Sequence, residues 1–69
     1  MEKRVTISFK RVVHETERAR LIEFMCMQLD NKTVQVWFPK SVTTLEYNRL
    51  YMDESIYNSA IEKYKASNF

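Results

Sequence analysis

Aromatic and basic side chains lie close together along this chain, in a pattern typical of single-strand nucleic-acid binding. Trp37 points away from the apolar side of its predicted strand, and Tyr47 and Tyr51 share a strand face with Arg49. Exposed rings of this kind stack on unpaired bases, while arginine and lysine side chains meet the phosphates. The candidate nucleic-acid-binding residues are Lys10, Arg18, Arg20, Trp37, Lys40, Tyr47 and Arg49.

The same side chains also have an interpretation without a ligand. A chain this short needs every apolar atom, so the rings could instead fill the second face of the sheet beneath a helix. Two strands paired around residues 14–17 would place Arg18 and Arg20 beside the basic residues of the first strand, and such like charges are mildly unfavourable. The cluster is either a phosphate or acidic-partner site, or a solvated edge neutralised by the acidic residues of the turn. The small charge excess favours the edge.

Catalytic chemistry finds little support in the residue types. His14 is the one histidine and lies in or beside a polar turn, and Cys26, the one cysteine, lies in the most apolar segment and is predicted to be a buried, inert thiol. One histidine and one cysteine cannot form a structural zinc site, and a chain without glycine has no phosphate-cradling loop. We therefore expect a protein that is not an enzyme, with no catalytic residues, metal site or cofactor.

Docking on another protein is the second functional hypothesis. Four methionines and the exposed aromatics suit an adaptable interface, such as that of an inhibitor or adaptor that docks on a host bacterial protein. A homodimer formed through residues 19–29, which are apolar on both faces, is compatible with either function. Monomer and homodimer both remain open.

Length and composition limit the number of domains, the cellular compartment and the net charge of the protein. Sixty-nine residues with 45% hydrophobic content predict one folded domain over residues 1–69. The chain can form no internal disulfide, and it shows no signal peptide and no long apolar run, which predicts the bacterial cytoplasm and no membrane association. The net charge is +2, and the excess lies in the first twenty residues, with six basic against three acidic side chains. Strong nucleic-acid binders usually carry more positive charge.

Alternating apolar and polar residues predict the elements that must position these side chains. We expect strands over residues 3–13, 19–29, 33–38 and 44–52, followed by a helix over 53–66 that is capped by Asp53. Short connections favour an antiparallel four-stranded meander, which in a small chain curls into a partly open barrel. The predicted class is mainly β, of the α+β type, with the single C-terminal helix covering one end or one open face.

The run VWFPKS at residues 36–41 carries a resemblance to a known family. Together with HETERARLIEF, which contains Thr16 and Ala19, and the closing NRLYMDESIYNSAIEKYK, it resembles small uncharacterised proteins of phages, prophages and plasmids that share a W-x-P-K-S box. The resemblance implies a mobile-element origin and a small sheet-plus-helix fold. It implies no single settled activity, but the frequent association of these proteins with DNA metabolism favours nucleic acid.

The box itself also has a purely structural interpretation. Pro39 lacks the amide donor that ladder pairing requires, so it ends the strand that contains Trp37. Lys40 and Ser41 then begin the connection to the next strand, where Ser41 can bond to the local backbone. On this interpretation the box fixes a turn, and the contacts of Trp37 decide whether it does more.

Overall fold

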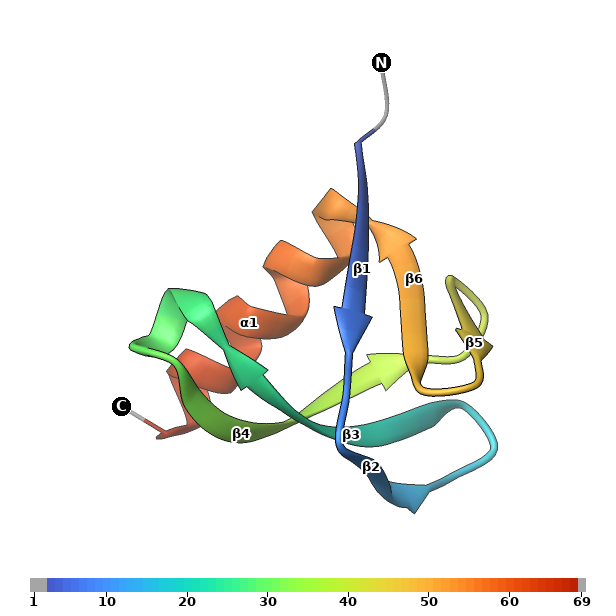
Figure 1. The fold of residues 1–69 in the computed structure, drawn as a ribbon, viewed down its shortest axis with the longest axis horizontal. Coiled ribbons are helices and arrows are strands. Elements are labelled where there is room, and N and C mark those ends of the chain that lie inside the picture. Colours follow the sequence, from blue (N-terminus) through green and yellow to red (C-terminus); the bar gives the residue numbers. More distant parts are fainter. Residues whose placement is uncertain (1–2, 69) are drawn as a thin grey trace.

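The computed structural model describes residues 3–68, which form two three-stranded antiparallel sheets and one C-terminal helix (Figure 1). The elements in chain order are β1 (Arg4–Ser8), β2 (Arg11–Glu15), β3 (Ala19–Cys26), the 3-10 helix η1 (Met27–Leu29), β4 (Lys32–Pro39), β5 (Thr43–Glu46), β6 (Arg49–Asp53) and α1 (Glu54–Asn68). The strand orders are β1-β6-β5 and β2-β3-β4. The mainly β class with a C-terminal helix is confirmed.

The predicted four-stranded meander is wrong, because the first predicted strand breaks into β1 and β2. The backbone changes partner at the break: Phe9 N–H donates to the Asn48 carbonyl (3.1 Å), and the next amide, Lys10 N–H, donates to the Glu23 carbonyl (2.8 Å). Residues 3–13 therefore contribute one strand to each sheet, and the two sheets do not close into a barrel. Phe9 and Lys10 still fit the alternation, and Arg11 is the first residue that departs from it, so the pattern does not place the break between Phe9 and Lys10.

The fourth predicted strand is also two strands, joined as a hairpin. Glu46 lies opposite Arg49, which leaves Tyr47 and Asn48 as the turn between β5 and β6. Tyr47 has a φ of 52°, a left-handed conformation that non-glycine residues adopt reluctantly. The predicted continuous strand over 44–52 is therefore wrong.

The hairpin of β3 and β4 agrees more closely with its prediction. β3 ends at Cys26 instead of continuing to residue 29, because Met27–Leu29 form a 3-10 turn. Asp30 and Asn31 then both take positive φ values, 59° and 57°, and reverse the chain. Both residue types tolerate this conformation better than most, which is why the turn was recognisable without glycine. β4 ends at Pro39 as expected.

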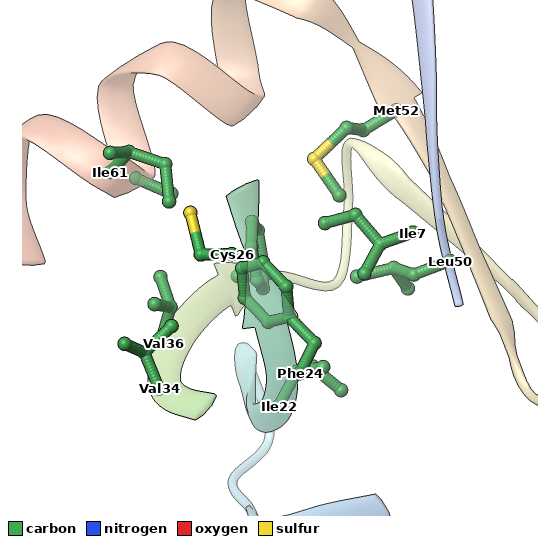
Figure 2. Close-up of a cluster of buried hydrophobic side chains, with 11 residues drawn as sticks. Ile7, Ile22, Phe24, Cys26, Val34, Val36, Leu50, Met52 and Ile61 are labelled. Atoms are coloured by element: carbon green, nitrogen blue, oxygen red, sulfur yellow. The ribbon is translucent and has the colours of Figure 1, made fainter. Parts of the chain in front are cut away.

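The apolar core lies between the two sheets and the helix. Figure 2 shows Ile7, Leu50 and Met52 of the first sheet facing the β3 side chains, with Val34, Val36 and Ile61 on the other side. The alternation that predicted buried Val34, Val36 and Phe38 is confirmed. α1 contacts β4, β6 and β1, and buries Ala60 and Ile61.

The helix begins one residue later than predicted and extends two residues further. Asp53 is the last residue of β6, and the Glu54 amide donates to the Lys3 carbonyl (2.9 Å). The first turn of α1 is therefore tied to the residue that precedes β1. Within residues 3–68, α1 is too short and too polar to cross a bilayer.

Candidate functional site

The outer face of the β2-β3-β4 sheet, which points away from the core, carries two rows of polar and aromatic side chains. Strand register places each row directly across the three strands. One row is His14, Leu21 and Trp37, and the other is Arg11, Glu23 and Gln35. We call the surface formed by these six residues the outer face.

Trp37 and His14 form an aromatic pair at one edge of this face. Their ring centroids are 6.0 Å apart and their planes are nearly perpendicular at 87°, a favourable edge-to-face geometry. Trp37 remains 46% exposed. The prediction that it points away from Val36 and Phe38 is confirmed, and the helix does not bury it. Its other side borders a hollow of about 410 Å³ between β4 and α1, also lined by Lys63.

A register shift explains why His14 reaches Trp37. Val12 lies opposite Ile22, but the next paired residue is His14, opposite Leu21, so one extra residue is accommodated between them. Such a bulge turns the following side chain to the other side of the sheet. His14 is exposed and belongs to β2, so of the two predicted places, within a polar turn or beside one, it has the second, next to the connection at residues 16–18. Sequence reasoning left His14 out of the candidate set because no residue signals the bulge, and it left out Arg11 because the pairing of Arg11 with Glu23 depends on strand register.

The second row neutralises its central carboxylate. Arg11 Nε donates to Glu23 Oε1 (3.2 Å), and Gln35 Nε2 donates to Glu23 Oε2 (3.1 Å). The Gln35 hydrogen bond, followed by that of Arg11, lowers the pKa of Glu23. Lys10 lies next to this row, where its Nζ donates to Thr33 Oγ1 (3.2 Å). The row therefore presents cationic groups to solvent together with a compensated Glu23.

Arg20 and Lys40 converge on Glu15 at the end of the sheet. Arg20 Nε lies 2.9 Å and Lys40 Nζ 3.6 Å from Glu15 Oε1. The hydrogen bond from Arg20, then the charge of Lys40, lowers the pKa of Glu15. The Arg20 side chain is only 18% exposed, and its Nη1 is buried without a hydrogen-bond partner among the described residues.

The expected crowding of basic residues across the first two strands does not occur. Arg11 lies opposite Glu23, and Glu15 lies opposite Arg20, so the register pairs opposite charges. Glu15 acts as a counter-ion, as the solvated-edge interpretation proposed. This pairing directs the Arg20 head group to a carboxylate within the protein.

Arg18, Lys40 and Ser41 line a shallow hollow of about 660 Å³ together with Glu17 and Pro39. The Lys40 amide donates to the Arg18 carbonyl (2.8 Å), which joins the two loops at this end of the sheet. Thr43 Oγ1 donates to the Pro39 carbonyl (2.6 Å) and shapes the turn after the box. The W-x-P-K-S box is thus divided between the outer face, through Trp37, and this hollow.

Tyr47 and Arg49 belong to the other sheet. Tyr47 is fully exposed at the β5–β6 turn, so its predicted place on a strand face beside Tyr51 is wrong. Arg49 does share a face of β6 with Tyr51, but it lies opposite Glu46. The structure therefore brings together Lys10, Arg18, Trp37 and Lys40 around the β2-β3-β4 sheet, and separates Tyr47 and Arg49 from them.

The thiol is placed as expected. Cys26 is a free, buried cysteine, and its Sγ lies 3.5 Å from the hydroxyl oxygen of Tyr57. Burial, with the Cys26 contact as a second cause, raises the pKa of the Tyr57 hydroxyl. In the part of the chain that the structure describes, no three His, Cys, Asp or Glu side chains are grouped to hold a metal ion.

No protein-family model, curated protein or solved structure matches this chain. The resemblance to phage and plasmid proteins with a W-x-P-K-S box therefore remains a prediction.

Proposed function

We propose that this protein binds single-stranded nucleic acid on the outer face of the β2-β3-β4 sheet. The observation that carries the proposal is Trp37, half exposed and held edge-on by His14 on an open three-stranded sheet. A ring fixed in this way offers a stacking surface to an unpaired base at little entropic cost, because its position is already set. Antiparallel sheets with exposed rings are a recurrent platform for such ligands.

Basic groups flank the ring pair along the strands. Arg11 lies on the outer face with Lys10 beside it at one end, whereas Arg18 and Lys40 lie around the separate hollow at the other end of the sheet, where Lys40 is paired with Glu15. From Gln35 to Pro39, β4 advances about 13 Å. A strand that stacks one base on Trp37 can therefore bring phosphates toward both ends of the face.

The charge balance predicts weak, salt-sensitive binding. Glu15, Glu17 and Glu23 lie among these basic residues, and Glu15 is paired with both Arg20 and Lys40. With three or four phosphate contacts, the logarithm of the association constant should fall with log[salt] at a slope of roughly −2 to −3. Base stacking then has to supply much of the affinity.

The test is a fluorescence titration with a twelve-residue oligothymidylate at low salt. We expect the base to quench Trp37 on stacking, and Trp37→Ala, followed by anisotropy of a labelled oligonucleotide, to weaken binding about ten-fold or more. Trp37→Phe should retain part of the affinity, because it keeps a ring. Saturable binding with no change in Trp37 fluorescence, or unchanged affinity in Trp37→Ala, contradicts the proposal.

Two further variants locate the contacts. Arg18→Gln removes a charge from the hollow at the end of the β2-β3-β4 sheet and should make the salt slope shallower by about 0.7. Arg49→Gln removes the same charge from the other sheet and is the matched control, expected to leave the slope unchanged. Equal effects of the two variants would point to attraction by overall charge without a defined face.

A further inference from the structure

The outward edge of β1 is unpaired. The Glu54 amide bonds to the Lys3 carbonyl, and the Phe9 amide bonds to the Asn48 carbonyl, at either end of the β1–β6 pairing. Backbone groups alternate in direction along an antiparallel strand, so the odd-numbered residues of β1 are the ones bonded to β6. The amides and carbonyls of Thr6 and Ser8 consequently point away from it, and no strand in the described part of the chain pairs with β1 on that side.

The second half of β3 has a matching free edge. Lys40 N–H bonds to the Arg18 carbonyl and continues the β3–β4 register, so the even-numbered residues of β3 bond to β4. The Glu23 carbonyl accepts from Lys10 on the opposite side. By the same alternation, the backbone of Met25 points away from β4. β2 pairs only as far as Glu23, so no strand among residues 3–68 pairs with this edge.

A groove of about 780 Å³ lies between these two edges. Its lining includes Val5 through Ser8 on one side, with Met25, Met27 and Gln28 on the other. Phe24 and Tyr57 are also among its lining residues, and the first turns of α1 contribute Glu54 and Asn58. Met25 is 55% and Met27 82% exposed, which is high for apolar side chains beside an unpaired strand edge. In Figure 1, β1 stands apart from the η1 end of β3.

We infer that this groove binds an extended peptide segment of another protein by strand addition to β1. The occupant is set by the groove walls: backbone donors and acceptors at Thr6, Ser8 and Met25 are satisfied together by another extended backbone. A folded second copy fits less well, because η1 and α1 contribute the walls opposite β1 and leave a groove rather than an open sheet edge. The groove is thus the proposed location for the protein-docking hypothesis, and it is separate from the outer face.

The neighbouring side chains define the peptide chemistry. Val5 and Ile7 point toward the core, whereas Thr6 and Ser8 are exposed. An added strand places its side chains beside those of β1 on each side of the sheet. The preferred peptide therefore alternates, with apolar residues beside Val5 and Ile7 and small polar residues beside Thr6 and Ser8. The two mobile thioethers allow some variation in the apolar side chains.

The test uses a fluorescein-labelled eight-residue peptide in which valine and threonine alternate, measured by anisotropy. A peptide of the same composition with its valines contiguous is the matched control, and N-methylation of alternate amides provides a second control on the unchanged protein. We expect saturable binding of the alternating peptide alone, loss of binding for one N-methylated register, and slowed amide exchange at Thr6, Ser8 and Met25.

Thr6→Pro removes a donor that β6 does not use, so the fold should persist while peptide affinity falls by roughly ten-fold. Thr6→Val keeps the donor and should bind as the parent chain does. Equal binding of both peptides, or insensitivity to N-methylation, overturns the inference. Sedimentation as a dimer with Thr6 and Ser8 already protected also overturns it, because a second copy then occupies the edge. Oligothymidylate affinity should be unchanged in Thr6→Pro, which separates this result from that of the proposed function.

Discussion

At the scale of single residues, Glu15 organises the end of the β2-β3-β4 sheet. Arg20 lies opposite both Glu15 and the fully buried Phe38, so its aliphatic stem runs along the core while its head group needs a counter-ion. A charge removed from water is tolerable only when paired, and removing one partner leaves the other uncompensated. Glu15 supplies that partner and also holds Lys40, which begins the connection after the W-x-P-K-S box.

We predict that Glu15→Gln destabilises the fold, whereas Glu17→Gln in the adjacent turn does not. The amide can still accept a hydrogen bond, but it carries no charge to balance Arg20 and Lys40. Arg20→Met should be better tolerated than Glu15→Gln, because it keeps the apolar stem and removes the charge together with its unpaired Nη1. Urea unfolding midpoints of the three variants at neutral pH provide the measurement, and a Glu17→Gln effect as large as that of Glu15→Gln would contradict this account.

The same contact has a pH signature. The pKa of Glu15 in the fold is below its ordinary value, so its contribution to stability is complete above about 4.5 and is lost as the pH falls through the folded-state pKa. Glu23 acts in the same direction. Glu15→Gln should consequently show a shallower loss of stability on acidification than the parent chain, followed by urea unfolding from pH 7 to pH 3.

At the scale of elements, the β5–β6 turn holds a side chain where the backbone favours glycine. Tyr47 has positive φ and full exposure, so its ring contributes no burial to offset the conformational cost. A non-glycine residue in this region costs roughly 1–2 kcal/mol, partly offset in a glycine variant by the greater entropy of the unfolded chain. We predict that Tyr47→Gly stabilises the protein by about 0.5–1 kcal/mol in urea unfolding, with Tyr51→Gly in the adjoining strand destabilising it. A loss of stability in Tyr47→Gly would show that the ring makes a contact that outweighs its strain.

The elements also show which features of the fold were readable from the sequence. Alternation identified β4 and its buried residues, and the helical stripe identified α1, because both patterns record burial on one side. No such pattern in the sequence marks the break between Phe9 and Lys10. Both residues continue the alternation, and neither is a glycine or proline. What bends the strand is its pair of partners, Asn48 and Glu23, which are distant in sequence.

The candidate site could likewise be predicted from the sequence only in part. Trp37 was placed correctly, since it depends only on the parity of β4. His14 was not, because the bulge between Val12 and His14 reverses parity in β2. Arg20 was assigned to phosphate on charge alone, whereas the register gives it to Glu15. Side-chain chemistry is visible in a sequence, but the partner of each charge depends on strand register.

At the scale of the whole molecule, two different surfaces depend on one shared bend. Because β1 and β2 pair with different sheets, β2 continues the outer face that carries Trp37 and His14, while β1 diverges from β3 and opens the groove. The two residues that join these strands have different contacts: Phe9 packs against the core, and Lys10 reaches Thr33 beside the outer face. A nucleic-acid strand and a peptide could thus be bound at the same time.

One core joins these surfaces, so the two sheets should unfold together. Leu50 of β6 is fully buried and packs in the same cluster as Phe38 and Ile22 of the other sheet. We predict that Leu50→Ala, a substitution that costs about 2–5 kcal/mol in such sites, lowers the urea midpoint reported by Trp37 fluorescence as much as that reported by far-ultraviolet circular dichroism. Trp37 lies on the β2-β3-β4 sheet, which does not carry the substitution. That sheet shares its core with the other sheet and should not stay folded alone, because small domains of this kind unfold in one step. Met27→Ala in η1, whose side chain is 82% exposed, is the control and should shift neither midpoint by much. A Trp37 transition that stays at its parent midpoint while the dichroism signal moves would mean that the sheets are independently stable, and that the bend is a hinge between two units.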